Sequence, residues 1–477
     1  MATDRYSSPL CERYASEQMQ RIFSAEYKFS HWRKLWIALA EAERDLGLPI
    51  TQAQIDEMKA HVDDIDFDRA HVLEQQVRHD VMAHLLAYGE ACPSAKPIMH
   101  LGATSCYVGD NTDVIQMRDA LLLVRQRLLV AIKAVRDFAG KYKSLACLGY
   151  THFQSAQPTT VGKRASLWLQ DLVMDLHALD FRLGELSLLG CKGTTGTAAS
   201  FLELFGGDAD KAERLDKMIA EKFGFDGTIA VSGQTYTRKV DYNVVSVLCG
   251  IAQSAHKFAN DVRLLSHEKE LEEPFESKQI GSSAMAYKRN PMRSERMTAL
   301  CRYVIADSLN PALTASEQWL ERTLDDSANR RIALPEAFLA TDGILILLAN
   351  IARGLTVYPQ VIAKNLRREL PFIATENILM YCVEHKGGDR QELHEAIRMH
   401  SFAAAKAVKE QGADNDLLQR IAADSRFGLT GAELDAIVDV KAFVGMAERQ
   451  TEKYIAEVDK ILAANADCIG DDVDVTV

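Results

Sequence analysis

The chain has 477 residues and a formal net charge of −12, with 47% hydrophobic and 26% charged residues. This composition is typical of a globular protein, and the negative charge argues against a nucleic-acid or acidic-membrane partner. An anionic ligand therefore needs a local cationic pocket. The nine cysteines are scattered and form no Cys-x-x-Cys pair, so no zinc site or redox framework is indicated.

The N-terminal sequence predicts no secretory signal, because no apolar run follows residues 1–5. The most apolar stretch, residues 343–352, is about ten residues long and too short to span a bilayer. We therefore expect a reducing, cytoplasmic setting.

Shorter helical patterns, such as 31–46 and 51–61, predict an N-terminal helical domain over residues 1–104. Prolines and a Gly-Gly pair break up the helical patterns after residue 358, which predicts a C-terminal helical domain over 358–477. Between them, residues 105–357 form the predicted central domain.

The central domain carries helical patterns of unusual length. Apolar residues recur at steps of three and four between residues 112 and 141, which predicts one face of a helix of about thirty residues. A second run, 159–189, follows Pro158, a common helix-entry residue. We expect the helix formed by this run to bury Leu167 and Met174. Further helices are expected at 235–272, 292–307 and 329–355.

The predicted fold class is therefore all-α, with a central bundle of very long helices. Alternating β-branched residues are nearly absent, and the helices exceed the usual length of about three turns. Long apolar stripes of this kind often pack against another subunit, so we expect the bundle to be shared between chains.

Two polar segments lie in or near the N-terminal part. Residues 78–84 contain Arg78-His79-Asp80 and His84, and could equally be a solvated helix face. The spacing of five between the histidines disfavours a metal site. Residues 104–113 are almost entirely polar; Asn111 or Thr112 would cap the first long helix, and free backbone N–H groups there suit a carboxylate.

Two further segments carry groups suited to proton transfer. Residues 149–160 place His152 in an expected loop, and histidine titrates near neutral pH. Residues 281–291 begin Gly-Ser-Ser, end in proline, and carry Lys288 and Asn290; an ordinary polar loop has the same composition. With Arg289, Arg293 and Arg296, Lys288 forms a cationic cluster that suits a phosphate or dicarboxylate.

Two weaker patterns concern phosphate. Residues 192–197 are glycine-rich but lack the Gly-Lys-Ser/Thr ending and a preceding strand, so a nucleotide hydrolase is not supported. Residues 321–331 hold three arginines with Ser327, which could form a salt-bridged surface turn or hold a phosphate monoester.

Taken together, segments 104–113, 149–158 and 281–291 resemble the signature blocks of the fumarase/aspartase superfamily of lyases. Residues 151–154, 287–291 and 322–331 resemble the branch that acts on succinylated purine nucleotides. One departure is Ala286, which stands where the family usually has proline and should loosen this loop.

Two alternatives remain open. A sister lyase, such as argininosuccinate lyase or fumarase, is disfavoured by the arginines at 322–331, because its substrates carry no phosphate. A catalytically silent structural homologue is disfavoured because Ser282, His152, Lys288 and Asn290 are all present.

The resemblance implies a homotetramer with a helical core, three domains per chain, and active sites shared between subunits. It implies anti β-elimination of fumarate without metal or organic cofactor. The implied substrates are adenylosuccinate and succinylaminoimidazole carboxamide ribotide, both intermediates of purine biosynthesis.

The resemblance also implies residue roles. Ser282 would be the base, Lys288 would stabilise negative charge, and His152, oriented by Glu295, would protonate the departing nitrogen. The ribose phosphate would be bound by Arg13, Tyr14, Arg322, Ser327 and Arg331. The other implied substrate contacts are Arg78, His79, Asp80, Thr104, Ser105, Thr151, Gln234, Asn290 and Arg296.

Overall fold

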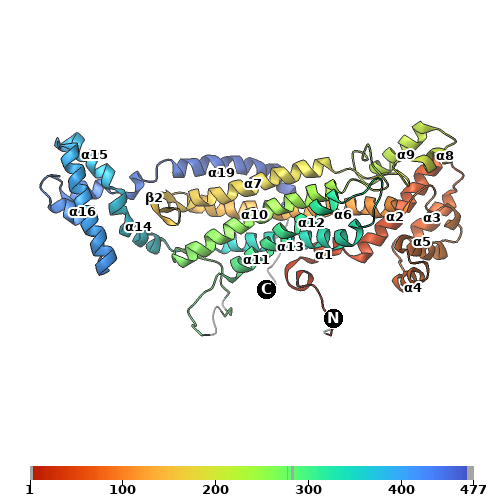
Figure 1. The fold of residues 1–477 in the computed structure, drawn as a ribbon, viewed down its shortest axis with the longest axis horizontal. Coiled ribbons are helices and arrows are strands. Elements are labelled where there is room, and N and C mark those ends of the chain that lie inside the picture. The colour runs from red at the N-terminus through yellow and green to blue at the C-terminus, as the bar shows by residue number, and fades with distance from the viewer. Residues whose placement is uncertain (1–3, 277, 281–283, 470–477) are drawn as a thin grey trace.

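The molecule is elongated, and its longest helices run side by side along the long axis (Figure 1). The computed structural model describes residues 4–276, 278–280 and 284–469. Within these residues the strands form only two short antiparallel pairs, so the all-α prediction is confirmed.

The central bundle contains five long helices. Numbered by their order within this bundle, the first helix packs along the second and the fifth. The third helix packs against the second, the fourth and the fifth. The apolar stripe predicted for the first helix, including Val114, Leu121 and Leu128, is fully buried. The helices are α6 (Ser105–Lys141), α7 (Val161–Glu185), α10 (Lys239–His267), α11 (Met292–Asp307) and α13 (Asp326–Gly354).

Helix α6 begins earlier than its apolar stripe predicted. Its N-cap is Thr104, and Asn111 and Thr112 lie buried inside the helix, so their predicted role as caps is wrong. The Asn111 amide donates to the Tyr107 carbonyl at 2.7 Å and to the Gly190 carbonyl at 3.2 Å. Hydrogen bonds within α6 and to Gly190 thus satisfy the Asn111 side chain, whereas the buried Thr112 hydroxyl has no hydrogen-bond partner among the described residues.

Residues 149–160 form a β-hairpin and not the expected loop. Strands β1 (Ala146–Thr151) and β2 (Gln154–Thr160) pair antiparallel, with an irregularity between Leu148 and Gly149. Pro158 pairs with Leu148 inside the sheet, so its predicted role in starting a helix is wrong. Thr160 caps α7 instead, accepting a hydrogen bond from the Lys163 N–H at 3.0 Å.

The outer face of α7 also differs from the prediction. Leu167 and Met174 were expected to be buried, but they are 45% and 62% exposed in this chain. With Phe181, which is 61% exposed, they repeat at seven-residue spacing along one face. A single chain leaves this stripe uncovered.

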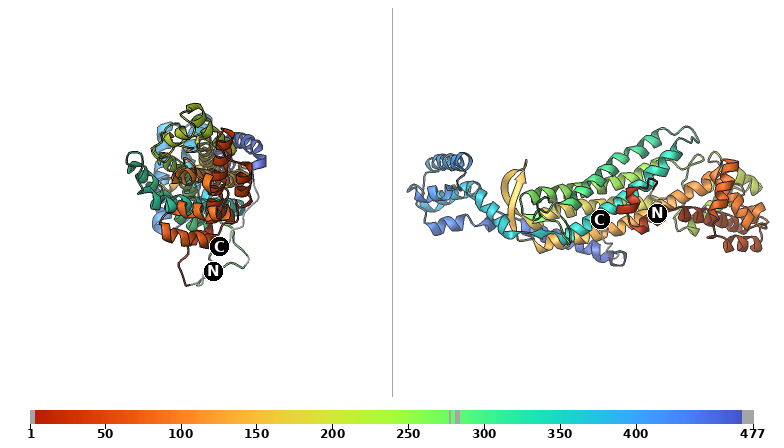
Figure 2. Two further views of the ribbon diagram at one scale, coloured as in Figure 1. Left: turned by 90° about the vertical axis from the view of Figure 1, so that its right-hand side faces the viewer. Right: turned by 90° about the horizontal axis from the view of Figure 1, so that it is seen from below.

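Most of the N-terminal elements lie at one end of the bundle, together with two helices that follow α7, whereas η1 and α1 pack along the side of the bundle (Figures 1 and 2). The predicted helix at 51–61 is present, and Thr51 and Gln54 form a capping box at its start. These elements are η1 (Leu10–Tyr14), α1 (Glu17–Ile22), α2 (Ala25–Asp45), α3 (Gln52–Ala60), α4 (Phe67–Val77), α5 (Asp80–Ala91), α8 (Ala199–Leu204) and α9 (Ala209–Lys222).

The C-terminal helices lie mostly at the opposite end and have an apolar cluster of their own, which includes Ile378, Leu393 and Phe427. The last helix returns along α6 and α7. The remaining α-helices and strands are β3 (Leu271–Glu272), α12 (Leu309–Ser316), β4 (Thr356–Val357), α14 (Pro359–Ile373), α15 (Thr375–Lys386), α16 (Arg390–Gln411), α17 (Leu417–Ala423), α18 (Gly431–Ile437) and α19 (Ala447–Ala464).

Helix α13 contains the apolar stretch 343–352. By length and composition alone it could cross a membrane, but 83% of its most apolar window is buried inside the molecule. It is therefore the core helix of the bundle.

Glu43, on α2, is a buried carboxyl group without an evident partner. Its side chain is inaccessible to solvent, and neither carboxylate oxygen has a hydrogen-bond partner among the described residues. Burial raises the pKa of Glu43 from 4.5 to about 8. The folded protein therefore holds a proton on Glu43 that the unfolded chain releases near pH 4.5.

This difference predicts a loss of stability as pH rises. Between about pH 5.5 and pH 8 the folded state binds more protons, so Glu43 lowers the free energy of unfolding by about 1.4 kcal/mol per pH unit. Glu43→Gln should remove this dependence, and its advantage in Tm over the unmodified protein should grow with pH. The control is Glu41→Gln on the same helix, because Lys222 and Lys59 outweigh burial and lower the pKa of Glu41. The effect of Glu41→Gln on Tm should not vary with pH between about pH 5.5 and pH 8. If the effect of Glu43→Gln on Tm were equally independent of pH, the prediction would be contradicted.

Candidate active site

A cavity of about 830 Å³ opens where the N-terminal helices meet the starts of α6 and α13. Its walls come from α2, the α4–α5 junction, α6, the segment before α10, and the segment that enters α13. The structure thus brings together predicted residues that are distant in sequence. This cavity group comprises Arg78, His79, Asp80, Ser105, Gln234, Arg322, Ser327 and Arg331.

The α4–α5 junction presents three of these residues. Arg78 ends α4 in a left-handed conformation with φ of 55°, and His79 is the N-cap of α5. The His79 Nδ1 accepts a hydrogen bond from the Met82 N–H, which leaves Nε2 3.2 Å from the Ser105 hydroxyl. His79 is thereby held with its outer nitrogen toward the start of α6.

Asp80 and Arg331 form an ion pair across the cavity mouth, at 2.8 Å. Burial alone would raise the pKa of Asp80, but the Val81 N–H and the charge of Arg331 outweigh it and lower the pKa. Arg331 is 59% exposed, so its guanidinium remains accessible to a ligand.

The far wall carries Gln234, Arg322 and Ser327. The Gln234 N–H donates to the Glu321 carbonyl at 3.0 Å, which ties its segment to the one that bears Arg322. The Gln234 side-chain oxygen lies 3.5 Å from the Cys106 sulfur. A hydroxyl, an amide and a guanidinium therefore share one wall.

Sequence reasoning missed Lys28. Its side chain lines the same cavity, and the ammonium lies 5.4 Å from the centre of the Trp32 ring. Within the sequence, Lys28 is one of several charges on an amphipathic helix, and nothing local sets it apart. Only the folded structure adds it to the cations of this cavity.

Thr104, Arg13 and Tyr14 do not line the cavity. Thr104 caps α6 directly beside Ser105. Arg13 and Tyr14 lie in η1, which packs on the middle of α13. The approach is close at Gly343, where a Cβ atom would lie 3.0 Å from the Tyr14 carbonyl oxygen.

Thr151 and His152 lie at the opposite end of the bundle. Both are exposed, and His152 and Phe153 form the hairpin turn with φ of 52° and 56°. The hairpin packs on α14, beyond the C-terminal end of α6, whereas Ser105 lies at the other end of that helix. The 37 residues of α6 span about 55 Å at 1.5 Å per residue.

The segment before α11 carries Lys288 and Asn290, and the first turns of α11 carry Glu295 and Arg296. Lys288 and Glu295 are exposed, and none of the four residues lines the cavity. The predicted base, Ser282, lies with Gly281 and Ser283 outside the described residues.

The predicted cationic cluster at this segment is partly neutralised. Arg289 lies 3.2 Å from Glu272, and Arg293 lies 3.0 Å from Glu276. Arg293 is also buried, and its backbone N–H donates to the Glu273 carboxylate at 2.8 Å. The contacts of Arg293 are therefore structural. Across residues 4–276, 278–280 and 284–469, His, Cys, Asp and Glu form no cluster of three or more suited to a metal.

Within one chain, the predicted residues thus lie at separate locations, which include the cavity, the β1–β2 hairpin and the region around the start of α11. The cavity group could hold an anionic ligand, while His152 could exchange a proton with a ligand at its own end. Each place offers part of the chemistry expected for the elimination reaction.

Comparison with known proteins identifies the family. Residues 7–306 match the family described as "Lyase", and residues 371–454 match "Adenylosuccinate lyase C-terminus". The chain is 51% identical over 455 residues to the adenylosuccinate lyase of Saccharomyces cerevisiae, covering 95% of this chain and 94% of that protein. It is 46% identical to the adenylosuccinate lyase of Schistosoma mansoni, covering 99% of each chain.

Solved structures share the fold at lower identity. The 3-carboxy-cis,cis-muconate lactonizing enzyme from Pseudomonas putida superposes with a TM-score of 0.82 at 22% identity, covering 94% of this chain and 98% of that one. A fumarate lyase from Mesorhizobium superposes with a TM-score of 0.79, also at 22% identity, over 95% and 99% of the two chains. These structures show the fold, and the 51% and 46% identity to adenylosuccinate lyases over 95% and 99% of this chain establishes that the chain belongs to the adenylosuccinate lyase family.

Proposed function

We infer that this chain is a carbon–nitrogen lyase that cleaves adenylosuccinate to AMP and fumarate. It also cleaves succinylaminoimidazole carboxamide ribotide, so that it acts twice in purine biosynthesis. The observation that carries this proposal is the gathering of Arg322, Ser327 and Arg331 in one cavity. Guanidinium groups with a hydroxyl suit a phosphate monoester, which the substrates of the sister lyases lack.

The elimination removes a proton from the carbon next to a carboxylate and breaks a carbon–nitrogen bond. Ser282 is the proposed base, and Lys288 stabilises the charge of the resulting aci-carboxylate. Electrons from this intermediate then expel the nitrogen, which His152 protonates while Glu295 orients the imidazole. Asn290 binds the succinyl carboxylate, with Arg296 and Thr151 nearby in the assembled site.

The cavity group holds the nucleotide part of the substrate. Arg322, Ser327 and Arg331 bind the phosphate, joined by Arg13 and Tyr14. The polar groups are held by Thr104, Ser105 and Gln234, while Arg78, His79 and Asp80 line the pocket. The reaction uses no metal and no organic cofactor.

A homotetramer with shared active sites is the proposed assembly. Its support is the uncovered α7 stripe of Leu167, Met174 and Phe181, since large apolar side chains in regular register favour helix packing. Further exposed apolar residues, including Leu309 and Leu313, lie on α12. The distance between His152 and the cavity group supports the sharing of sites. We place this enzyme in the cytoplasm. We also propose that the chain divides into three domains, with boundaries near residues 105 and 358.

Purified protein should release fumarate and AMP from adenylosuccinate, measured by ultraviolet absorbance and product chromatography. Activity should persist with a chelator present, and argininosuccinate and malate should not be turned over. Absence of fumarate would contradict the proposed function. Loss of activity with chelator would contradict the metal-free mechanism, and turnover of argininosuccinate alone would favour the sister lyase.

A further inference from the structure

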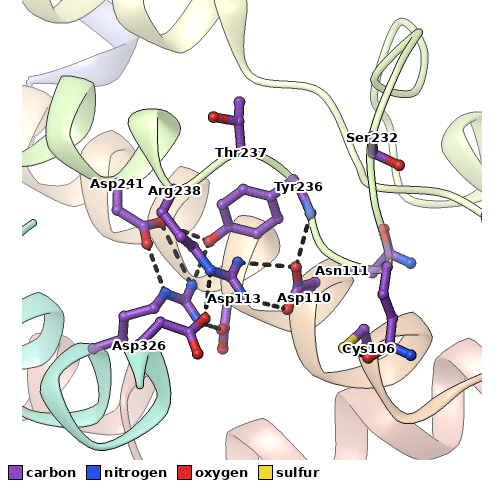
Figure 3. Close-up of polar contacts among 12 residues, drawn as sticks. Cys106, Asp110, Asn111, Asp113, Ser232, Tyr236, Thr237, Arg238, Asp241 and Asp326 are labelled. Atoms are coloured by element: carbon purple, nitrogen blue, oxygen red, sulfur yellow. Dashed lines mark hydrogen bonds and ion pairs between the residues drawn. The ribbon is translucent and has the colours of Figure 1, made fainter. Parts of the chain in front are cut away.

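A buried ion-pair network joins residues of the cavity wall (Figure 3). At its centre the Arg238 guanidinium donates two hydrogen bonds to Asp110, at 2.9 and 3.1 Å, and one to Asp326, at 2.7 Å. The three side chains are 2%, 6% and 1% exposed, respectively. Asp110, Arg238, Asp326 and the adjoining Arg322 are together called the Arg238 bridge.

Within the bridge, Asp326 links Arg238 to Arg322. One oxygen of its carboxylate accepts from Arg238, and the other accepts from the Arg322 guanidinium at 2.9 Å. Arg322 lines the cavity and is 24% exposed. Burial alone would raise the pKa of Asp326, but Arg238 and Arg322 lower it, so the carboxylate stays charged.

Each arm of the bridge ends beside a proposed substrate contact. Asp110 lies in the first turns of α6, which Ser105 begins, and Asp326 directly precedes Ser327. The Tyr236 N–H donates to Asp110 at 3.0 Å, two residues after Gln234. The bridge therefore fixes three cavity walls relative to one another.

A second branch of the network joins Asp241 to Arg330, which also lines the cavity. Asp241 accepts from the Tyr236 hydroxyl and from Arg330, both at 2.6 Å, and its side chain is 1% exposed. Asp241 matches Asp326 in burial and in having two partners, but it does not line the cavity. Neither of these partners, Tyr236 or Arg330, is a proposed substrate contact, so Asp241 offers a matched control.

We propose that Asp326 is a positioning residue that aims the Arg322 guanidinium at the substrate phosphate, with Arg238 and Asp110 holding Asp326 in place. This inference rests on the proposed function of the cavity. Arg322 lies in the segment between α12 and α13, where an arginine side chain has many rotamers. An arginine already fixed by a buried carboxylate loses less freedom when it binds the phosphate.

Asp326→Asn tests this role, because it keeps the shape and removes the charge. The KM for adenylosuccinate should rise by about tenfold or more, while kcat falls by less than about threefold, because phosphate binding serves ground and transition states alike. The Kd for AMP, measured by calorimetry, should rise with KM. Asp241→Asn should lower Tm comparably but leave KM within about twofold.

Two results would overturn the positioning role. One is an unchanged KM in folded Asp326→Asn protein; the other is an equal rise in KM in Asp241→Asn, which would mean a general structural effect. Should Asp326→Asn not fold, Arg322→Lys is the second variant, since lysine keeps the charge but lacks the fork that spans Asp326 and a phosphate. Its KM should also rise about tenfold, and an unchanged KM would overturn the proposal.

A double variant sharpens the assignment. In an Arg322→Gln background, Asp326→Asn should change KM by less than about twofold, because its effect acts through Arg322. A further large rise would assign Asp326 a role independent of Arg322 and overturn the inference. Inactive unmodified protein would instead contradict the proposed function itself, so the two failures are distinguishable.

Discussion

His152→Ala is expected to lower kcat by about a hundredfold or more, while the Kd for adenylosuccinate changes by less than about threefold. The imidazole lies exposed at the tip of the β1–β2 hairpin, where it can meet a ligand without rearrangement of the core. Its proposed contribution, protonation of the leaving nitrogen, occurs in the transition state. Turnover and calorimetric binding on the same protein measure the two effects separately.

The matched control is His394→Ala, the same change at an exposed position on α16. It should leave both constants within about twofold. Ser282→Ala should lower kcat as His152→Ala does, with Ser283→Ala as its neighbouring control. Near-normal turnover in His152→Ala protein would transfer the acid role to another group.

The long helices were predictable because each carries its own apolar period. Helix α11 lies at 292–307 as expected, and the buried stripe of α6 follows its steps of three and four. The hairpin at 146–160 was missed because its strands are short and contain Gly149 and Pro158, residues that normally indicate turns. The exposed face of α7 could not be predicted from one chain, because its burial depends on what packs against it.

The sequence named candidate site residues one by one, but it did not predict how they are grouped in space. Local motifs pointed to Arg322, Ser105 and His152, yet no spacing indicates that the first two share a cavity and the third does not. The Arg238 bridge joins positions 110, 238 and 326, which no local pattern connects. Such contacts arise only when α6, α10 and α13 pack together.

Mixing two nearly inactive variants is expected to restore activity when their lesions lie in different groups. His152→Ala alters the hairpin, and Arg331→Glu puts a negative charge in the cavity group, at a side chain that is 59% exposed. Along one chain α6 alone separates the two places by about 55 Å, far more than a nucleotide substrate spans. A site that uses both residues must therefore take them from different chains.

Equal amounts of the two proteins, allowed to exchange subunits, should leave roughly one quarter of the sites with neither lesion. Each of these sites should turn over at the unmodified rate, whereas each parent alone stays nearly inactive. The matched control mixes Arg322→Glu with Arg331→Glu. Both lesions belong to the cavity group, so every site contains one of them and no recovery is expected.

The pair of mixtures separates complementation from simple stabilisation by hybrid formation. Recovery of activity in both mixtures would mean that mixing itself repairs the variants. If activity recovers in neither mixture although mass spectrometry verifies hybrids, then one chain supplies both groups. The same design with Ser282→Ala and His152→Ala extends the test to the proposed base. Recovery there would assign the acid and the base to different subunits, so that proton removal and proton delivery depend on the association of chains.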